Sequence, residues 1–452
     1  MQLIPRSPSA LRLGLMAATC ALLAPVVHAQ ESAEVSAEEE KPLQVDTGLF
    51  FYKENKARIQ SYDAIVDLKK DFGDEEVAGL RISVDSLSGG SPNGAIASHW
   101  AQTFAMPSGA SLHSSAGAPI TYTTASGRVV SQLAKVTLYT VAPGELPLDT
   151  SFHDRRIAGD LSWSQPFGQD NHLSFGGHLS HELDFLSVSG NAGLNHDFNS
   201  KNTTLAAGFS AELDSVKPVG GIPLAGTDYA LLQKSGTSQS KHVLGWQLGV
   251  TQVLARNWIV SANFSFDRSG GYLTDPYKIL SVVDGAGAGT GYVFERRPDS
   301  RSRQSLFLDS KLALGDSILD LSYRHGWDDW GTKSDTVEGR YRFEFGSNDW
   351  YLEPHLRWYR QGAADFYHLY LDGGSATPAF MSADPRLAAF TAQTVGLKVG
   401  IPMDEDEELS FRLEGYRQNA AVRSSPLTGL SGLDLNPSLQ SIVFQVNWRF
   451  SY

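Results

Sequence analysis

The final segment of the chain, residues 439–452, alternates between two kinds of side chain along its whole length. Every second residue is apolar, which gives the set Ile442, Phe444, Val446, Trp448, Phe450 and Tyr452. The residues between them are mostly polar, namely Val443, Gln445, Asn447, Arg449 and Ser451. Successive side chains of a strand point to opposite faces, so one face here suits lipid and the other suits a polar interior. The pattern predicts a strand of a transmembrane antiparallel β-barrel.

The two ends of the chain indicate the same compartment. Arg6 and Arg12 precede an apolar run that ends in Val27-His28-Ala29, which predicts a cleaved signal peptide over residues 1–29. The run is shorter than the roughly 17–25 residues of a spanning helix, and the residues before Cys20 fit a lipid-attachment site poorly. A chain that ends on an aromatic residue also resembles the C-terminal insertion signal of Gram-negative outer-membrane barrels. We therefore expect integral outer-membrane localisation.

Composition excludes several classes of protein. The net charge is −13, and loss of the leader makes it more negative, so nucleic acid is not expected as a partner. No apolar run after residue 29 is long enough for a spanning helix, while aromatic residues make up 10% of the chain, as membrane-interface girdles require. Cys20 is the only cysteine, so cleavage removes disulfide and thiol chemistry. A secreted soluble β-protein is the alternative, but its outward faces should be polar.

Alternation divides the mature chain into an acidic periplasmic tail, residues 30–44, and a barrel with long extracellular loops, residues 45–452. About sixteen strands are predicted, an even number that leaves both ends in the periplasm. They cover residues 45–52, 64–72, 77–87, 156–166, 172–182, 188–198, 203–214, 242–254, 258–267, 305–314, 318–325, 336–345, 350–361, 390–401, 409–418 and 439–452. Long connections near residues 88–154, 215–240, 270–300, 362–387 and 420–437 are expected to be extracellular or to fold into the lumen.

The inward face of the later strands is predicted to carry both signs of charge. Placing the apolar residues outside leaves these residues inside: Arg324, Arg340, Arg342, Glu353, Arg357 and Arg412. One interpretation is a wide lumen with simply polar walls. The other is a charge-lined constriction that selects solutes.

A catalytic interpretation is tested on the same faces. His172 with Ser174, and His178 with Ser180, repeat a His-x-Ser spacing that outer-membrane lipid hydrolases aim at the bilayer. Here Leu173, Phe175 and Leu179 take the lipid side, so the pairs point inward. No soluble-type catalytic, dinucleotide or metal motif is present. We expect no enzymatic activity, no cofactor and no metal, with an outer-membrane hydrolase as the weakest alternative.

Several loop-end motifs occur in combination: SGGSPNG at 88–94, GYLTDPYK at 271–278, RPDSR at 297–301, DDWG at 328–331, ADFY at 364–367 and SADPRL at 382–387. Together they resemble an uncharacterised proteobacterial family of outer-membrane β-barrels with a domain of unknown function. The resemblance covers nearly the whole mature chain. It implies a barrel and supplies no substrate or catalytic residue.

The predicted topology brings most of these motifs to the extracellular mouth. The residues expected to share that rim are Asp275, Asp299, Arg301, Arg324, Asp328, Asp329, Arg360, Asp365, Asp384 and Arg386. They either dock the loops against the wall through ion pairs or form a gate for a solute or cation, since carboxylates also hold Ca²⁺.

We predict a porin-like conduit for a small hydrophilic solute. Its other expected partners are outer-membrane lipid and the barrel-assembly machinery, which the C-terminal strand would contact. The alternative is a non-conducting barrel that acts as a scaffold in an envelope assembly.

Overall fold

The computed structural model describes residues 42–56, 58–90, 92–105, 120–123, 129–132, 138–148, 153–346 and 349–452. The predicted signal peptide, residues 1–29, and residues 30–41 of the predicted acidic tail lie outside the described residues.

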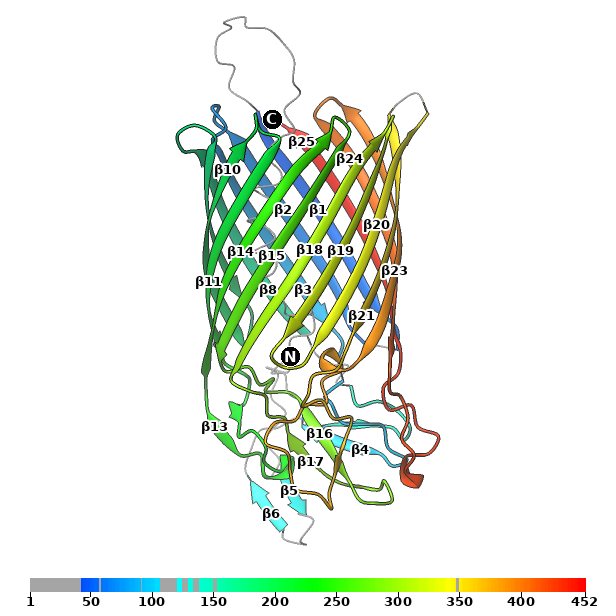
Figure 1. Ribbon diagram of the computed structural model, residues 1–452. Coiled ribbons are helices and arrows are strands. Elements are labelled where there is room, and N and C mark those ends of the chain that lie inside the picture. Colours follow the sequence, from blue (N-terminus) through cyan, green and yellow to red (C-terminus); the bar gives the residue numbers. More distant parts are fainter. Residues whose placement is uncertain are drawn as a thin grey trace, which may run out of the picture.

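Sixteen antiparallel strands form one closed barrel (Figure 1). In barrel order they are β1 (Leu43–Glu54), β2 (Gln60–Asp71), β3 (Val77–Ser88), β8 (His153–Pro166), β9 (Asn171–His181), β10 (Phe185–Phe198), β11 (Thr203–Val216), β14 (Gln239–Ala255), β15 (Trp258–Gly271), β18 (Ser300–Leu314), β19 (Ser317–Asp328), β20 (Lys333–Phe345), β21 (Trp350–Gln361), β23 (Phe390–Asp404), β24 (Glu407–Ala420) and β25 (Leu439–Ser451). The predicted fold class is confirmed, and each predicted segment falls on a different one of these strands. Most of the real strands extend further toward the loops than predicted.

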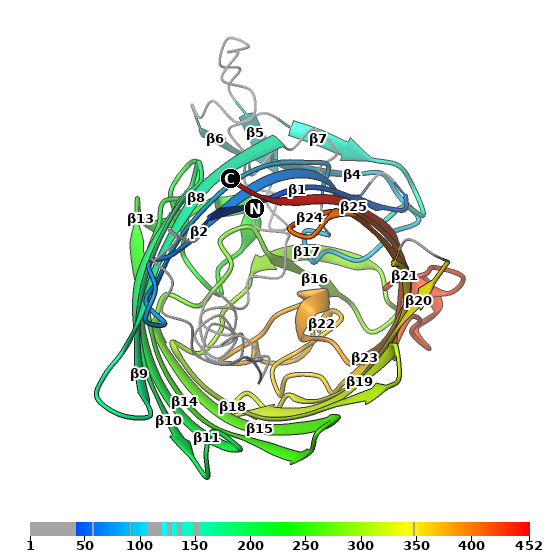
Figure 2. The same ribbon diagram turned by 90° about the horizontal axis from the view of Figure 1, so that it is seen from above.

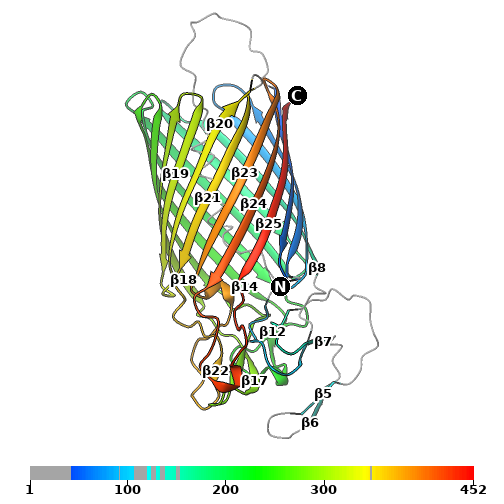
Figure 3. The ribbon, with the colours of Figure 1, turned by 90° about the vertical axis from the view of Figure 1, so that its right-hand side faces the viewer.

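The first and last strands close the barrel. Val45 of β1 lies opposite Phe450 of β25, and Thr47 lies opposite Trp448. Leu43 N–H donates to the carbonyl of Tyr452 at 2.9 Å, which carries the pairing to the end of the chain. This end of the barrel bears the short turns, and the opposite end bears the long connections (Figures 1 and 3). By the usual rule for such barrels, the short turns are periplasmic and the long loops extracellular.

The outer surface of the barrel is apolar. Leu161 is 65% exposed, Leu356 61% and Val395 62%, although each is a large hydrophobic residue in the middle of a strand. An apolar band around a closed barrel is the surface that lipid covers, so the molecule is an integral outer-membrane barrel. In the part of the chain that the structure describes, no helix is both long and apolar enough to span a membrane.

The long connections form a layer of small sheets at the extracellular mouth. They hold β4 (Gln102–Ala105) paired with β7 (Leu138–Val141), β5 (Ile120–Thr123) with β6 (Val129–Gln132), β12 (Ile222–Pro223) with β13 (Lys234–Gly236), and a sheet in the order β17 (Gly289–Phe294), β16 (Ile279–Val283), β22 (Leu371–Asp372). Three short 3-10 helices lie among them, η1 (Tyr229–Leu231), η2 (Pro385–Leu387) and η3 (Thr428–Leu430). Seen along the barrel axis, β16 and β22 lie inside the ring of the wall (Figure 2).

Apolar packing joins these loops to one another. Phe104 packs with Val141, Ile279 and Phe294, which come from two different loops. A second cluster joins Val283 to Leu430 and Leu435. The molecule therefore keeps its water-excluding core in the loop layer, while the barrel interior is lined by polar side chains.

Candidate functional site

The inner wall of β20, β21 and β24 carries a chain of charged contacts centred on His355. The ring Nε2 of His355 lies 3.2 Å from Glu338 Oε1, and its Nδ1 lies 2.9 Å from Glu414 Oε1. Arg340 also pairs with Glu338, which lies on the same strand. Arg412 lies 3.4 Å from Glu414. Because β23 lies between β21 and β24, the contact between His355 and Glu414 passes over that strand.

Two glycines of β23 make such contacts sterically possible. A Cβ at Gly396 would lie 2.8 Å from Glu414 Cγ, and one at Gly400 would lie 2.0 Å from the Tyr351 ring. The Tyr351 hydroxyl crosses Gly400 and donates to Glu408 Oε1 at 2.6 Å. Glycine supplies the space because it has no side chain.

Most ion pairs along the barrel wall join near neighbours. Arg81 pairs with Asp67, Arg156 with Asp85, Lys241 with Asp214, Lys311 with Asp320, Lys398 with Glu408 and Arg449 with Asp46. Each of these pairs connects adjacent strands of the barrel. Arg412 reaches Glu353 at 3.5 Å across one intervening strand. The widest of these connections is at the end with the short turns, where Lys201 of the β10–β11 turn lies 3.0 Å from Glu75 of the β2–β3 turn, with four strands between the two turns.

A second cluster of charges lies buried in the loop layer and is called here the loop clasp: Asp275, Lys278, Glu295, Arg297, Ser382, Asp384 and Arg386. Arg297 lies 2.7 Å from Glu295 and 2.8 Å from Asp384. Arg386 lies 2.8 Å from Asp275 and also pairs with Asp384. The clasp therefore ties the loop between β15 and β18 to the loop between β21 and β23.

Further hydrogen bonds complete the loop clasp. Ser382 Oγ donates to Glu295 Oε2 at 2.6 Å, and the backbone N–H of Asp275 donates to Glu295 Oε1 at 2.6 Å. Lys278, which is 1% exposed, donates to the carbonyl of Pro92 and so joins a third loop. Charges buried to this degree are stable only when they are paired and hydrogen-bonded.

The carboxyl groups of the loop clasp have shifted pKa values. Burial alone raises the pKa of a carboxyl, but the charges of Arg386, Arg297 and Lys278 outweigh burial and hold the pKa of Asp384 well below its ordinary value. At Glu295 burial wins, and the pKa is raised although Arg297 lies beside it. The Tyr277 hydroxyl, buried and bonded to Asp184, has its pKa raised well above 10.

The structure separates the residues that the sequence predicted to share one rim. Asp275, Asp384 and Arg386 meet in the loop clasp. Arg301 pairs instead with Asp328 on the wall, and its guanidinium lies 4.4 Å from the centre of the Trp330 ring. The backbone N–H of Ser302 donates to Asp329 at 2.9 Å.

The other predicted residues lie along the wall or in loops. Arg324 lies over the Phe307 ring at 4.7 Å, and Arg342 lies over the Tyr351 ring at 3.7 Å. Arg357 approaches Glu338 at 3.9 Å. Asp299 and Asp365 are exposed in loops.

Arg360 does not join the predicted rim. It is exposed and lies opposite Asp335 of β20, on the same outward face as Leu356 and Trp358. The strict alternation of strand β21 dictates this position, since residues 356, 358 and 360 share one face.

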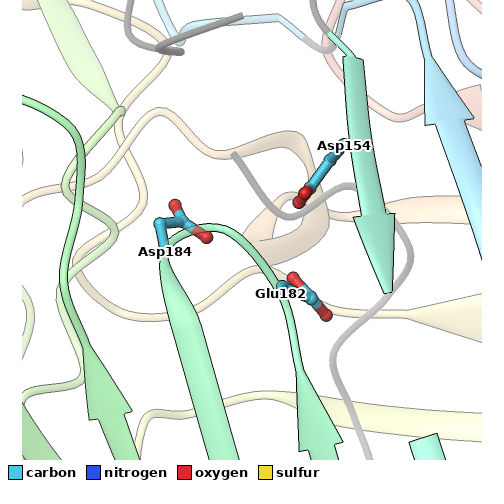
Figure 4. A group of neighbouring side chains, drawn as sticks. All are labelled: Asp154, Glu182 and Asp184. Atoms are coloured by element: carbon cyan, nitrogen blue, oxygen red, sulfur yellow. The ribbon is translucent and has the colours of Figure 1, made fainter. Parts of the chain in front are cut away.

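Three carboxylates that no sequence motif indicates lie at the extracellular ends of β8–β10. Asp154, Glu182 and Asp184 converge so that one oxygen of each lies within 4.8 Å of the others (Figure 4). Oxygen ligands of this kind suit a hard divalent cation such as Ca²⁺. No metal motif marks the group, because Asp154 lies in β8 whereas Glu182 and Asp184 lie in the turn between β9 and β10, and only the barrel brings these two segments together.

Glu295 and Lys278 were also missed. Glu295 lies just before the RPDSR motif, and Lys278 ends the GYLTDPYK motif. A charged residue in a motif gives no sign, in sequence alone, of being buried.

The two histidines of the His-x-Ser segments contact carboxylates. His178 Nδ1 lies 2.6 Å from Asp160 Oδ1, and His172 is bonded to Glu75. Among the described residues, neither ring is bonded to a serine hydroxyl. These contacts hold the two rings in place on the wall, and among the described residues neither ring is positioned to activate a serine hydroxyl.

Comparison with known proteins identifies the family of the chain. The model of a family described as "Protein of unknown function (DUF3570)" matches residues 13–450. Similar solved structures include a bacterial polysaccharide outer membrane secretin, at 7% identity and TM-score 0.45, with 92% of this chain and 100% of that chain covered. OpdK of Pseudomonas aeruginosa matches at 10% identity and TM-score 0.38, covering 91% and 98%. OccK2 of the same organism, solved with glucuronate, matches at 12% identity and TM-score 0.39, with 91% of this chain and 98% of that chain covered. Among curated proteins no sequence matches.

Proposed function

Because the chain belongs to the DUF3570 family of proteins of unknown function, we propose its function from the barrel itself: a porin-like conduit for a small hydrophilic solute across the outer membrane. The solute passes along the polar inner wall. No catalytic step is part of the proposal.

One observation carries this proposal, namely that the charges of the wall are paired within the wall. Pairs such as Arg81 with Asp67, and Lys241 with Asp214, join neighbouring strands, and the His355 chain stays on one side of the barrel. A barrel of sixteen strands encloses an interior wide enough for an aqueous path. Wall charges that are satisfied locally hold the side chains against the wall and favour an open polar lumen.

The wall also has a charge asymmetry that fits selection by sign. On the inner faces of β1–β3 and β8–β11 carboxylates outnumber cations; they are Asp46, Glu54, Asp63, Asp67, Asp71, Asp85, Asp154, Asp160, Asp197, Glu212 and Asp214, against Lys69, Arg81 and Arg156. On the inner faces of β18–β24 both signs of charge occur side by side. Fields of charged walls select small ions in a narrow, low-dielectric path. We propose that the conduit prefers cationic over anionic solutes.

Conductance in a planar lipid bilayer tests the proposal directly. The purified, folded barrel should give steady conductance steps whose reversal potential in a salt gradient indicates cation preference. A folded barrel that gives no steps in repeated insertions contradicts the conduit.

A specific observation favours a second function. The loop layer packs around its own core, and the loop clasp ties three loops together across the mouth. A mouth held in this way also suits a non-conducting scaffold in an envelope assembly. The same bilayer experiment separates the two, because a scaffold stays silent while a variant without residues 362–389 conducts.

A further inference from the structure

Six cations project from the outside of the barrel at its extracellular end. They are Lys53, Arg155, Arg268, Lys333, Arg360 and Arg417. All six are exposed, and each lies within the last four residues at the loop end of its strand. Along their strands they share the outward face with lipid-facing residues such as Ile157, Phe264, Leu356 and Leu413. These cations therefore stand at the border between the apolar belt and the extracellular loops.

These outward cations differ from the inward ones in their partners. Many cations of the lumen and of the loop clasp pair with carboxylates, as Arg81, Arg297 and Arg412 do, while Arg324 and Arg342 lie over aromatic rings. Among the described residues none of the six outward cations forms an ion pair, although Arg417 Nε donates to Asn419 Oδ1 at 3.3 Å. The molecule as a whole is acidic, with a net charge of −13, so the chain contains enough carboxylates to pair with these side chains. A group of unpaired cations at one membrane interface needs another explanation.

Three of the six cations, Lys333, Arg360 and Arg417, lie on the outer face of β20, β21 and β24, which with β23 form a continuous stretch of the wall (Figure 3). Arg360 lies opposite Asp335, and Lys333 lies beside that pair because its carbonyl accepts from Gly362 N–H at 2.8 Å. Trp358 lies opposite Gln393, which in turn lies opposite Arg417. Since neighbouring strands are roughly 4.8 Å apart and each residue rises roughly 3.3 Å along its strand, Arg360 lies roughly 8 Å from Lys333 and roughly 12 Å from Arg417, while Lys333 and Arg417 are roughly 20 Å apart.

The carboxylate of Asp335 lies beside these cations and is already engaged, while Glu407 lies at the opposite end of β24. Asp335 accepts hydrogen bonds from the Tyr323 hydroxyl at 2.8 Å and bonds with His325 at 2.8 Å. Below the cations the surface is apolar, with Leu356 61% and Val395 62% exposed. The patch thus has an apolar lower part, an indole ring at the border and cations above it.

We propose that Lys333, Arg360 and Arg417, with Trp358, bind the phosphate groups of a lipid headgroup in the outer leaflet. The acyl chains of such a lipid would cover the apolar belt directly below, so the site continues a surface that lipid already occupies. Guanidinium groups match phosphate with two parallel hydrogen bonds, and tryptophan favours the membrane interface. The position of the cations above the belt, rather than in the lumen, separates this site from the conduit.

Native mass spectrometry of the detergent-purified full barrel tests the site. The probes are a diphosphorylated glucosamine-disaccharide lipid and its dephosphorylated form at equal concentration. The wild-type barrel should retain the phosphorylated lipid preferentially. Each cation near a charged lipid surface contributes about a fivefold change in binding, so the triple variant Lys333→Gln, Arg360→Gln, Arg417→Gln should lose roughly a hundredfold.

Matched controls keep the result specific. Arg256→Gln removes one exposed cation at the periplasmic turns and should bind lipid as the wild type does, whereas Arg360→Gln should bind about fivefold less. Heat-modifiable mobility on a gel establishes that each variant is folded, and if the triple variant does not fold, the single variants Arg360→Gln and Arg417→Gln carry the test. Equal retention of both lipids, an unchanged triple variant, or full displacement by millimolar inorganic phosphate would overturn the proposal.

Discussion

At the scale of single residues, Gly396 has the most direct structural reason for its identity. A Cβ there would lie 2.8 Å from Glu414 Cγ, so Gly396→Ala should push Glu414 away from His355. Overpacking of this kind costs about 1–3 kcal/mol. We expect the free energy of unfolding, measured by urea titration in detergent, to fall by that amount.

A double-mutant cycle identifies the cause. In a Glu414→Ala background the steric conflict is gone, so the added cost of Gly396→Ala should nearly vanish. Gly415→Ala is the matched control, because a Cβ at Gly415 would meet nothing within 4 Å. If Gly415→Ala costs as much as Gly396→Ala, the contact is not the reason for the glycine.

Asp384 gives a prediction about pH. Its pKa is lowered in the folded loop layer, so its ionised form stabilises that layer. This contribution is complete above the unfolded pKa of about 3.9 and is lost as the pH falls below that value through the folded pKa. Glu295 acts in the opposite sense, because its pKa is raised. Cleavage of the loops by pepsin in the intact barrel should therefore accelerate below about pH 4.

The substitution Asp384→Asn should remove much of that acid dependence and make the loops protease-sensitive at neutral pH as well. It removes one of the two carboxylate partners of Arg297 and of Arg386 in a buried site, at a cost of about 3–5 kcal/mol to loop docking. The barrel should keep its heat-modifiable mobility. Asp316→Asn, in an exposed periplasmic turn, should change nothing. Neutral-pH loops as resistant as the wild type would show that the clasp does not hold them.

At the scale of strands, the two faces of β21 should respond oppositely to charge. Leu356→Arg places a cation in the apolar belt near the middle of the strand, at a cost of about 2–4 kcal/mol. Glu353→Gln, on the inner face, should cost far less. Both are measured by unfolding in lipid vesicles. Equal costs would mean that the facing of the strand is wrong by one residue.

The terminal strand gives a second prediction at this scale. Residues 448–452 of β25 pair with β1 and close the barrel. Their deletion should leave β1 with an open edge and prevent a heat-modifiable barrel from accumulating in the outer-membrane fraction. Deletion of residues 31–40 is the control and should leave assembly intact. We propose that the same strand is the segment that the assembly machinery contacts.

Sequence predicted the strands well and the loops poorly, for a physical reason. A strand between lipid and a polar lumen must alternate at every step, so residues 350–361 reveal their facing locally. The loop clasp depends on contacts between residues far apart in the chain, such as Asp275 with Arg386, 111 positions away. Proximity to one mouth was predictable, but the burial of Glu295 and the pairing of Asp384 with Arg297 were not. Arg360 was placed at the rim although the alternation of its own strand turns it outward.

At the scale of the whole molecule, the lumen is bounded by two unlike surfaces. The inner faces of β1–β3 and β8–β11 are mainly acidic, and those of β18–β24 hold paired charges of both signs. The field of the acidic side extends about 30 Å at 10 mM salt and about 8 Å at 150 mM. An open conduit should therefore prefer cations strongly at low salt and weakly at high salt.

Two variants of opposite sign test that field. Asp63→Asn with Asp160→Asn removes acidic charge from one side and should shift the reversal potential in a salt gradient toward anions. Arg340→Gln with Arg357→Gln removes positive charge from the other side and should shift it toward cations. Both pairs lie on inner faces, so neither should alter heat-modifiable mobility. Shifts in the same direction, or shifts that do not shrink between 10 mM and 1 M salt, would mean that the wall charges do not set the selectivity. Selection would then have to lie in the loop layer, where removal of residues 362–389 should change it.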